Sequence, residues 1–260
     1  MSDAELERIR SAYRERDAAK ETPYRWDNPG YVTYMQQVER ALLRAFADAG
    51  VELAGARVLD VGCGSGYFLH RLREFGAGEC HGIDLIENRI EEGRERYPTL
   101  HLRVGSATDL PFADGEFDLV TQFTCLSSIV DADVRTVATR EMQRVARGGW
   151  VLSLDMRGMR PPALRRPPPP TLTPTVPLDE KELRRLFGKP TLLRRVGLVF
   201  DLTDRIGRHE IVTAALTMLP PLRSHLIGLW RVPVGRESGP EPLNALEAEE
   251  RVSSENRQAP

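Results

Sequence analysis

Short apolar runs alternate with amphipathic segments through the middle of the chain. Five runs, RVLDV, HGID, LHLRV, FDLVTQF and WVLSLDM, recur between residues 57 and 156, and helix-patterned stretches fill most of the gaps. A strand–helix–strand rhythm is typical of a parallel sheet with helices on both faces. Two later runs, TLLRRVGLVF and HLIGLWRV, predict two more strands. The pattern therefore predicts an α/β fold built on a doubly wound, mostly parallel, seven-stranded sheet.

Three helices are predicted outside that core. Residues 31–49 place apolar side chains on one helical stripe and end at Gly50, so this helix should pack against the sheet. Alternating charges over residues 1–17 suit a second helix. Asp179 and Glu182 have the spacing of a capping box, which predicts the start of a third.

Proline and polar residues divide the later part of the chain. Prolines recur through residues 160–177, which rules out regular helix or central strand there and predicts an extended loop. The end of the chain is rich in Pro, Glu and Ser and has little to bury. The predicted organisation has four parts: an N-terminal helical segment at 1–50, a main domain at 51–234, a mostly polar late insertion at 201–223 within it, and a disordered tail at 235–260.

Composition narrows the range of partners. The 260 residues carry 36 Lys plus Arg against 38 Asp plus Glu, and a formal net charge of −2 supplies no field that would attract nucleic acid or an anionic membrane. The start of the chain lacks the apolar run of a secretory signal, and the most apolar late stretch is too short to span a bilayer. Three cysteines without a C-x-x-C pair suggest neither a disulfide framework nor a zinc site. We therefore expect a cytoplasmic protein with a small-molecule substrate and with no nucleic acid, membrane or metal partner.

The segment VLDVGCGSGYF is a strand that runs into a tight turn and then a helix. The turn holds three alternating glycines, Gly62, Gly64 and Gly66. Glycine tolerates positive φ and has no Cβ, so a ligand can lie against the main chain. A dinucleotide-binding turn needs its third glycine where this chain has Tyr67, which disfavours an NAD-dependent oxidoreductase. Asp60 would repel a pyrophosphate but can pair with an ammonium group, so the turn predicts a ligand with a cationic amino-acid part.

Asp84 ends the second apolar run, in the sequence HGIDL. On this type of fold a carboxylate at that distance from the glycine turn accepts from the ribose hydroxyls of a nucleoside. The alternative is that Asp84 only caps the helix that follows. Both interpretations stay open at this point.

Four motifs in order resemble the class I S-adenosylmethionine-dependent methyltransferases, in particular their small-molecule branch. The motifs are VLDVGCGSGYF, GIDLIENRI, GSATDLPFADGEFDLV and RVARGGWVL, and the resemblance covers roughly residues 57–156. It implies a Rossmann-like fold and S-adenosyl-L-methionine as the cofactor. The cofactor-binding residues that it implies are Asp60, Gly62, Gly64 and Gly66 at the methionine end, Asp84 at the ribose with Leu85 beside it, Ser106 and Ala107 at the adenine, and Gln122 and Phe123, whose backbone meets the methionine amino group.

The sequence departs from the family pattern at the third motif. The family often has an aspartate after the glycine of the third motif, and this chain has Ser106, whose oxygen accepts more weakly. Asp109 is an alternative acceptor, although a turn-forming role before Leu110 is the simpler interpretation. After the fourth run there is no Asn/Asp-Pro-Pro-Tyr tetrad, which argues against methylation of nucleobase amino groups or protein amides.

The catalytic residues are unknown from the sequence, with Asp155 and His209 as weak candidates for a general base. A solvated or Arg157-paired Asp155 and a surface His209 are the alternatives. Arg157, Arg160 and Arg165 would suit an anionic or sugar-linked substrate or simply form a solvated basic loop. A metal would need several carboxylates near the acceptor, and only Asp155 is present after the fifth run.

Aromatic residues crowd the segment before the helix at 31–49. Tyr24, Trp26, Tyr31 and Tyr34 would form one wall of an acceptor pocket, with the insertion at 201–223 as the opposite wall, so that the two make a lid. The alternative is that these aromatics only anchor the helix to the core.

The function that these features favour is O-methylation of a sugar or natural-product intermediate by S-adenosylmethionine. The alternatives are N- or C-methylation of a small metabolite, or a non-catalytic module that only binds S-adenosylmethionine. The sequence does not determine the oligomeric state, and a homodimer is the candidate assembly.

Overall fold

The structure, a computed structural model, describes residues 3–18, 27–157, 175–197 and 223–234, together with residues 212, 215 and 219. Some predictions lie outside the described residues: those on Tyr24, Trp26, Arg160, Arg165, His209, most of the proline-rich loop at 160–177, most of the insertion at 201–223, and the tail at 235–260.

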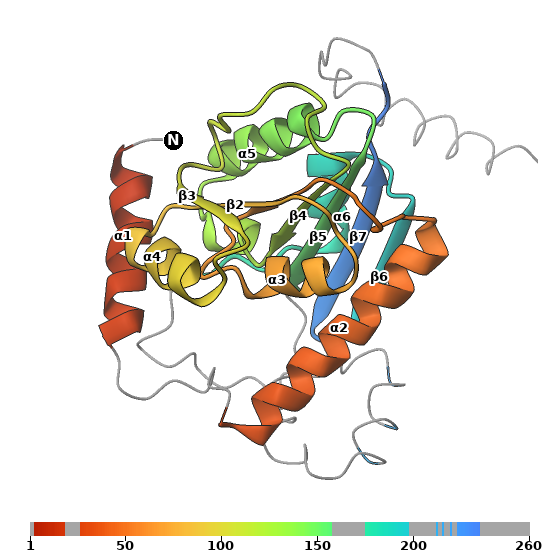
Figure 1. Ribbon diagram of the computed structural model, residues 1–260, viewed down its shortest axis with the longest axis horizontal. Helices are drawn as coiled ribbons and strands as arrows, with labels where there is room; N and C mark the ends of the chain where they lie inside the picture. Colours follow the sequence, from red (N-terminus) through yellow and green to blue (C-terminus); the bar gives the residue numbers. More distant parts are fainter. Residues whose placement is uncertain are drawn as a thin grey trace, which may run out of the picture.

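Seven strands form one sheet with the order β3-β2-β1-β4-β5-β7-β6 (Figure 1). The strands are β1 Val58–Val61, β2 Cys80–Asp84, β3 His101–Val104, β4 Leu119–Phe123, β5 Trp150–Met156, β6 Leu192–Val196 and β7 His225–Arg231. Strands β1 to β5 pair in parallel, and β7 is antiparallel to both β5 and β6. The predicted mostly parallel α/β sheet is confirmed. The sequence pattern did not predict that β7 inserts between β5 and β6.

Helices cover both faces of this sheet (Figure 1). They are α1 Asp3–Ala18, α2 Pro29–Ala49, α3 Tyr67–Glu74, α4 Glu87–Arg96, the 3-10 turn η1 Leu126–Ser128, α5 Ala132–Val145 and α6 Glu180–Phe187. Apolar side chains alternate between two core layers, because successive residues of a strand point to opposite faces. On β1, Val58 packs in the layer of α2, α3 and α4, whereas Leu59 and Val61 pack in the layer of α5 and α6. The sheet is therefore doubly wound, as predicted.

Helix ends follow the local chemistry of the sequence. The side chain of Asn28 accepts from Gly30 N, Pro29 takes the first turn, and Gly50 closes α2 in the left-handed conformation. The Asp179 side chain accepts from the backbone N–H of Glu182, which confirms the predicted cap of α6. The Glu182 carboxylate pairs with Arg185.

Candidate functional site

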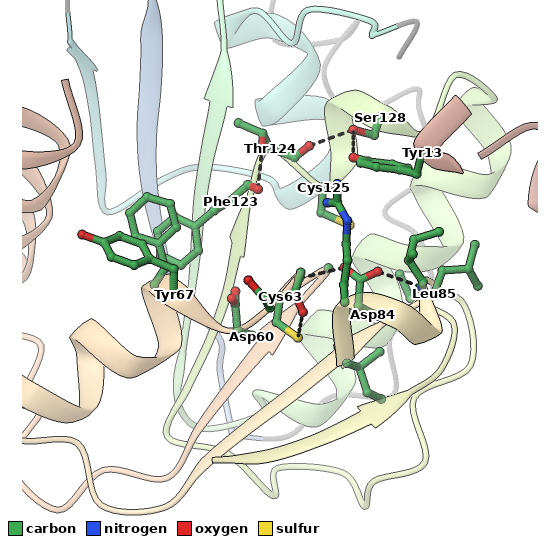
Figure 2. A pocket seen from close by; sticks show the side chains of 18 of the residues that line it. Tyr13, Asp60, Cys63, Tyr67, Asp84, Leu85, Phe123, Thr124, Cys125 and Ser128 are labelled. Atoms are coloured by element: carbon green, nitrogen blue, oxygen red, sulfur yellow. Dashed lines mark hydrogen bonds between the residues drawn. The ribbon is translucent and has the colours of Figure 1, made fainter. Parts of the chain in front are cut away.

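A pocket lies at the carboxyl ends of β1, β2 and β4 (Figure 2). This is the point where the strand order reverses, because β1 pairs with β2 on one side and with β4 on the other. Open α/β sheets bind ligands at such a switch point. The predicted cofactor residues that line the pocket are Asp60, Gly62, Gly64, Asp84, Leu85, Ala107 and Phe123.

The glycines of the turn after β1 have different roles. A Cβ at Gly62 would lie 2.5 Å from Cys125 Sγ, so this position needs glycine for protein packing. Gly66 lies at the start of α3 and does not line the pocket. A Cβ at Gly64 would meet only Arg89 Nη1, at 4.0 Å, although its φ of +55° is also one that favours glycine. Gly64 is therefore the glycine whose missing side chain leaves space to a ligand.

Two carboxylates, the buried Asp60 and the half-buried Asp84, flank this turn in the pocket (Figure 2). Asp60 is only 2% exposed, and its carboxylate accepts from Thr121 Oγ1 at 2.8 Å. Burial raises the pKa of Asp60 to about 8. Burial also raises the pKa of Asp84, against the lowering effect of its backbone hydrogen bonds. A cationic ligand would stabilise the ionised form of both groups.

Asp84 connects two segments of the pocket wall. Its Oδ2 accepts from Gly64 N at 2.8 Å, and its Oδ1 accepts from Ile86 N at 2.9 Å, just before α4. The two sequence-based interpretations of Asp84 are therefore not exclusive, because the residue supports the start of α4 and also lines the pocket. A carboxylate oxygen accepts more than one hydrogen bond, so both oxygens retain the capacity to accept from a ligand hydroxyl.

The raised pKa of Asp60 predicts a pH-dependent affinity for S-adenosylmethionine. Below a pKa of about 8, ligand binding must displace a proton from this carboxyl, so the affinity should rise from pH 6 to pH 7.5. The slope should approach tenfold per pH unit. Isothermal titration calorimetry across this range measures it, and Asp60→Asn should bind weakly with a clearly smaller slope. An equal slope in the variant would assign the titration to another group.

Only some of the residues predicted for the adenine end line the pocket. Ala107 lines the pocket, but Ser106 does not. The Ser106 hydroxyl lies 2.8 Å from Thr108 Oγ1 and accepts from Thr108 N, so it serves its own turn. Asp109 bridges back to Ser106 and does not line the pocket either, which matches its turn-forming interpretation.

Gln122 and Asp155 lie behind the pocket. Phe123 lines the pocket, and its ring stacks on Phe68 with the centroids 4.1 Å apart. The Gln122 side chain points to the other face of the sheet, where it donates to Ser153 Oγ at 2.5 Å. Asp155 is fully buried and accepts from Gln122 and from Ser127 N. Alternation along β5 turns the Asp155 side chain away from the pocket, so it is neither among the lining residues, as a general base would be, nor solvated.

Helix α1 supplies pocket residues that the sequence did not indicate. Ile9 and Tyr13 line the pocket, and the Tyr13 hydroxyl lies 3.1 Å from Ser128 Oγ (Figure 2). The Arg89 guanidinium of α4 lies 4.5 Å from the centre of the Tyr13 ring. Glu5 accepts from Val130 N at 2.9 Å. The alternating charges of α1 resemble those of a solvated helix, so no local signal marks where it docks.

Because α1 forms part of the pocket wall, its removal should speed cofactor release. Deleting residues 1–26 keeps Asn28 and Pro29, which start α2. We expect S-adenosylmethionine to dissociate about tenfold faster, since the contacts of Ile9 and Tyr13 are worth on the order of 1–2 kcal/mol together. Stopped-flow fluorescence measures the rate, and the melting temperature of the ligand-free protein serves as the control. Unchanged dissociation in a folded variant would contradict a role of α1 in retaining the cofactor.

The aromatic residues before and in α2 divide between the two predicted roles. Tyr31 lines the pocket, as does Met35 one turn later. Tyr34 is buried with its hydroxyl 2.8 Å from Nε2 of His225 at the start of β7, so it joins α2 to the sheet. Of the arginines proposed for substrate binding, Arg157 is described and does not line the pocket.

Membrane-spanning and metal-binding features are absent from the described residues. No helix among them combines the length and the apolar character needed to cross a bilayer. They contain no group of three or more His, Cys, Asp or Glu side chains placed to hold a metal ion.

In sequence, part of this chain resembles known methyltransferases. Residues 58–149 match a family described as "Methyltransferase domain". The chain is 38% identical over 118 residues to a demethylmenaquinone methyltransferase of Staphylococcus aureus strain MRSA252, a match that covers 43% of this chain and 47% of that protein. The chain thus spans about half the length of the curated relatives it matches.

Solved structures with the same fold are more distant in sequence. The PH0226 protein of Pyrococcus horikoshii superposes with a TM-score of 0.57 and 16% identity, over 78% of this chain and 91% of that one. An S-adenosylmethionine-dependent methyltransferase of Mesorhizobium loti superposes with a TM-score of 0.54 and 18% identity, over 73% of this chain and 96% of that one. At these identities the likeness shows the fold.

Proposed function

We propose that the chain is a class I S-adenosylmethionine-dependent methyltransferase that acts on a small-molecule acceptor, since residues 58–149 match a family described as a methyltransferase domain. The observation that carries the proposal is the pair of pocket carboxylates, the buried Asp60 and the half-buried Asp84, beside the open space at Gly64. A nucleoside that bears a sulfonium and an ammonium group matches this combination of negative charge and accessible main chain.

Different residues of the pocket would bind different parts of this cofactor. Asp60 offers its charge at the methionine end, Asp84 offers its oxygens to the ribose, and Leu85 and Ala107 give the adenine an apolar surface. When bound, S-adenosylmethionine supplies an electrophilic methyl group on a sulfonium. The protein contributes mainly position and the exclusion of water, because such a transfer disperses charge rather than creating it.

The acceptor side of the pocket is largely apolar and aromatic. Tyr31 and Met35 of α2 face it, together with Phe68 and with Phe123 at the end of β4. Tyr67 also lines it, and its hydroxyl donates to Glu39 Oε1 of α2 at 2.5 Å, which ties α3 to α2. This wall supports a natural-product intermediate with an apolar ring over a sugar. The Staphylococcus aureus relative is named for demethylmenaquinone, which keeps a quinone among the acceptors to test.

The atom that is methylated has two candidates. O-methylation is the proposed reaction, because the family signature is of the small-molecule type and the amino-group tetrad is missing. N- or C-methylation is the second candidate. It is favoured by the described pocket lining, in which no histidine occurs and the only two carboxylates lie at the proposed cofactor end.

The test is a methyl-transfer assay with deuterated-methyl S-adenosylmethionine. Phenols, quinols, sugars and aliphatic amines are offered in separate panels, and mass spectrometry detects the labelled product and S-adenosylhomocysteine. We expect turnover with a ring-bearing acceptor. Tight cofactor binding without turnover across all panels would instead support the non-catalytic binding module.

Two further properties stay predictions of the sequence. A homodimer is tested by light scattering coupled to gel filtration, and a cytoplasmic location by fractionation of the source cells. Neither is needed for the proposed chemistry.

A further inference from the structure

The turn after β4 brings backbone and side chains to the pocket in a strained conformation. Phe123, Thr124 and Cys125 line the pocket in succession, and Ser128 follows at the end of η1. Thr124 has a φ of +58°, the only positive φ of a non-glycine residue in the described part of the chain. A β-branched residue adopts this conformation only where the surrounding structure enforces it. Something other than local preference must therefore hold the turn.

The Gln122 side chain holds the turn from behind. Its Oε1 accepts from Cys125 N at 2.9 Å and from Leu126 N at 3.2 Å. An amide has one acceptor oxygen and one donor nitrogen, so this arrangement turns Nε2 toward β5. There Nε2 donates to Ser153 Oγ and to the Asp155 carboxylate.

Asp155 supports the same orientation of the Gln122 amide from the side of β5. Burial raises the pKa of Asp155 to about 6, so the carboxyl is mainly ionised at neutral pH and both oxygens accept. Oδ2 accepts from Gln122, and Oδ1 accepts from Ser127 N at 3.2 Å, on the far side of the turn. Gln122, Ser153 and Asp155 are all fully buried, so water cannot replace a lost partner. The pair thus fastens the turn at both ends.

We propose that Gln122 and Asp155 are positioning residues, which hold the turn at 123–128 in its cofactor-binding conformation without lining the pocket themselves. The proposal rests on the proposed function for the identity of the ligand, S-adenosylmethionine. It assigns to Asp155 a function different from that of a general base.

The donor and acceptor pattern of the pair supplies a sharp test. In Asp155→Asn, the new amide nitrogen faces either Gln122 Nε2 or Ser127 N–H, so that two hydrogen-bond donors oppose each other. Rotating the Gln122 amide removes the first of these clashes, but its Nε2 then faces the N–H of Cys125. Gln122→Glu alone sets two carboxyl groups against each other. The double variant Q122E/D155N reverses the polarity of the pair. The amide introduced on β5 then donates to the carboxylate introduced on β4, and every backbone donor of the turn regains an acceptor.

The experiment compares wild type with D155N, Q122E, Q122E/D155N and the control T139V, which removes a buried hydroxyl that donates to Arg135 O within α5, outside the pair. Calorimetry gives the Kd for S-adenosylmethionine, and hydrogen exchange gives the protection of residues 123–128 in the ligand-free protein. We expect D155N to weaken binding at least tenfold and to lose protection in this turn. The double variant should return to within about threefold of wild type in both measurements, and T139V should stay near wild type.

Other results would contradict either the positioning role or the proposed function. Normal affinity and protection in D155N, or a folded double variant that binds as weakly as D155N, would overturn the positioning role. If the single variants do not fold, the double variant alone decides, because it keeps volume and hydrogen bonds. If wild type does not bind S-adenosylmethionine, the proposed function fails, while hydrogen exchange still tests whether the pair holds the turn.

Discussion

Gly64→Val is expected to abolish measurable binding of S-adenosylmethionine in a protein that still folds. The Cβ at this position points to open space, with only Arg89 Nη1 at 4.0 Å, so the added side chain fills the volume of the ligand rather than that of the protein. The φ of +55° adds backbone strain on the order of 1–2 kcal/mol. Calorimetric titration measures binding, and circular dichroism with thermal melting measures the fold.

Gly55→Val is the matched control for that strain. Gly55 has a φ of +72° with nothing within 4 Å of its Cβ position, and it precedes β1 at the end of the strand away from the pocket. The control should lose a similar amount of stability and keep its affinity. Equal affinity in the two variants would mean that the glycine turn serves only the backbone.

Asp84→Ala is expected to weaken S-adenosylmethionine binding by about 100-fold or more. Hydrogen bonds to a charged group are worth about 1.5–3 kcal/mol each, and the loss of the carboxylate would remove ligand contacts together with the support of Gly64 N and Ile86 N. Because the turn also loses this support, the expected loss of binding free energy lies at or above the upper end of the range for one hydrogen bond.

Asp118→Ala serves as the control for Asp84. Asp118 also accepts from a backbone N–H, that of Arg57 at 2.8 Å. It directly precedes β4, at the amino-terminal end of the strand, whereas the pocket lies at the carboxyl end. The control should cost stability without changing the Kd for the cofactor. A folded Asp84→Ala protein that binds as tightly as wild type would remove Asp84 from the site.

Apolar periodicity predicted the strands and the helix that became α2, because it reports burial directly. The position of β7 between β5 and β6 could not be predicted in this way. Its pairing depends on how the chain returns across the sheet after β6, and neither HLIGLWRV nor TLLRRVGLVF carries a signal for its neighbours.

Short-range spacing predicted the candidate site where the ligand is expected to meet main chain. Gly62, Gly64 and Asp84 are examples, since their spacing along the strand–helix–strand unit β1-α3-β2 determines their geometry. A position at the end of a strand made Asp155 a candidate base, but the face of β5 to which its side chain points keeps it out of the pocket. It shares that face with Val151, which packs in the layer of α5, and this alternation was available in the sequence.

The docking of α1 depends on long-range contacts that no local pattern reveals. Glu5 and Tyr13 reach residues more than 100 positions away, at Val130 and Ser128. A polar helix with alternating charges is compatible with many such positions. The pocket wall formed by Ile9 and Tyr13 therefore required the structure.

The central claim is that the pocket between β1, β2 and β4 binds S-adenosylmethionine, and calorimetric titration of the wild-type chain at pH 7.5 tests it most directly. The account predicts saturable binding of one S-adenosylmethionine per chain, competition by S-adenosylhomocysteine, and no heat of binding with NAD. Saturable binding of NAD, or no binding of S-adenosylmethionine by the folded protein, would contradict it.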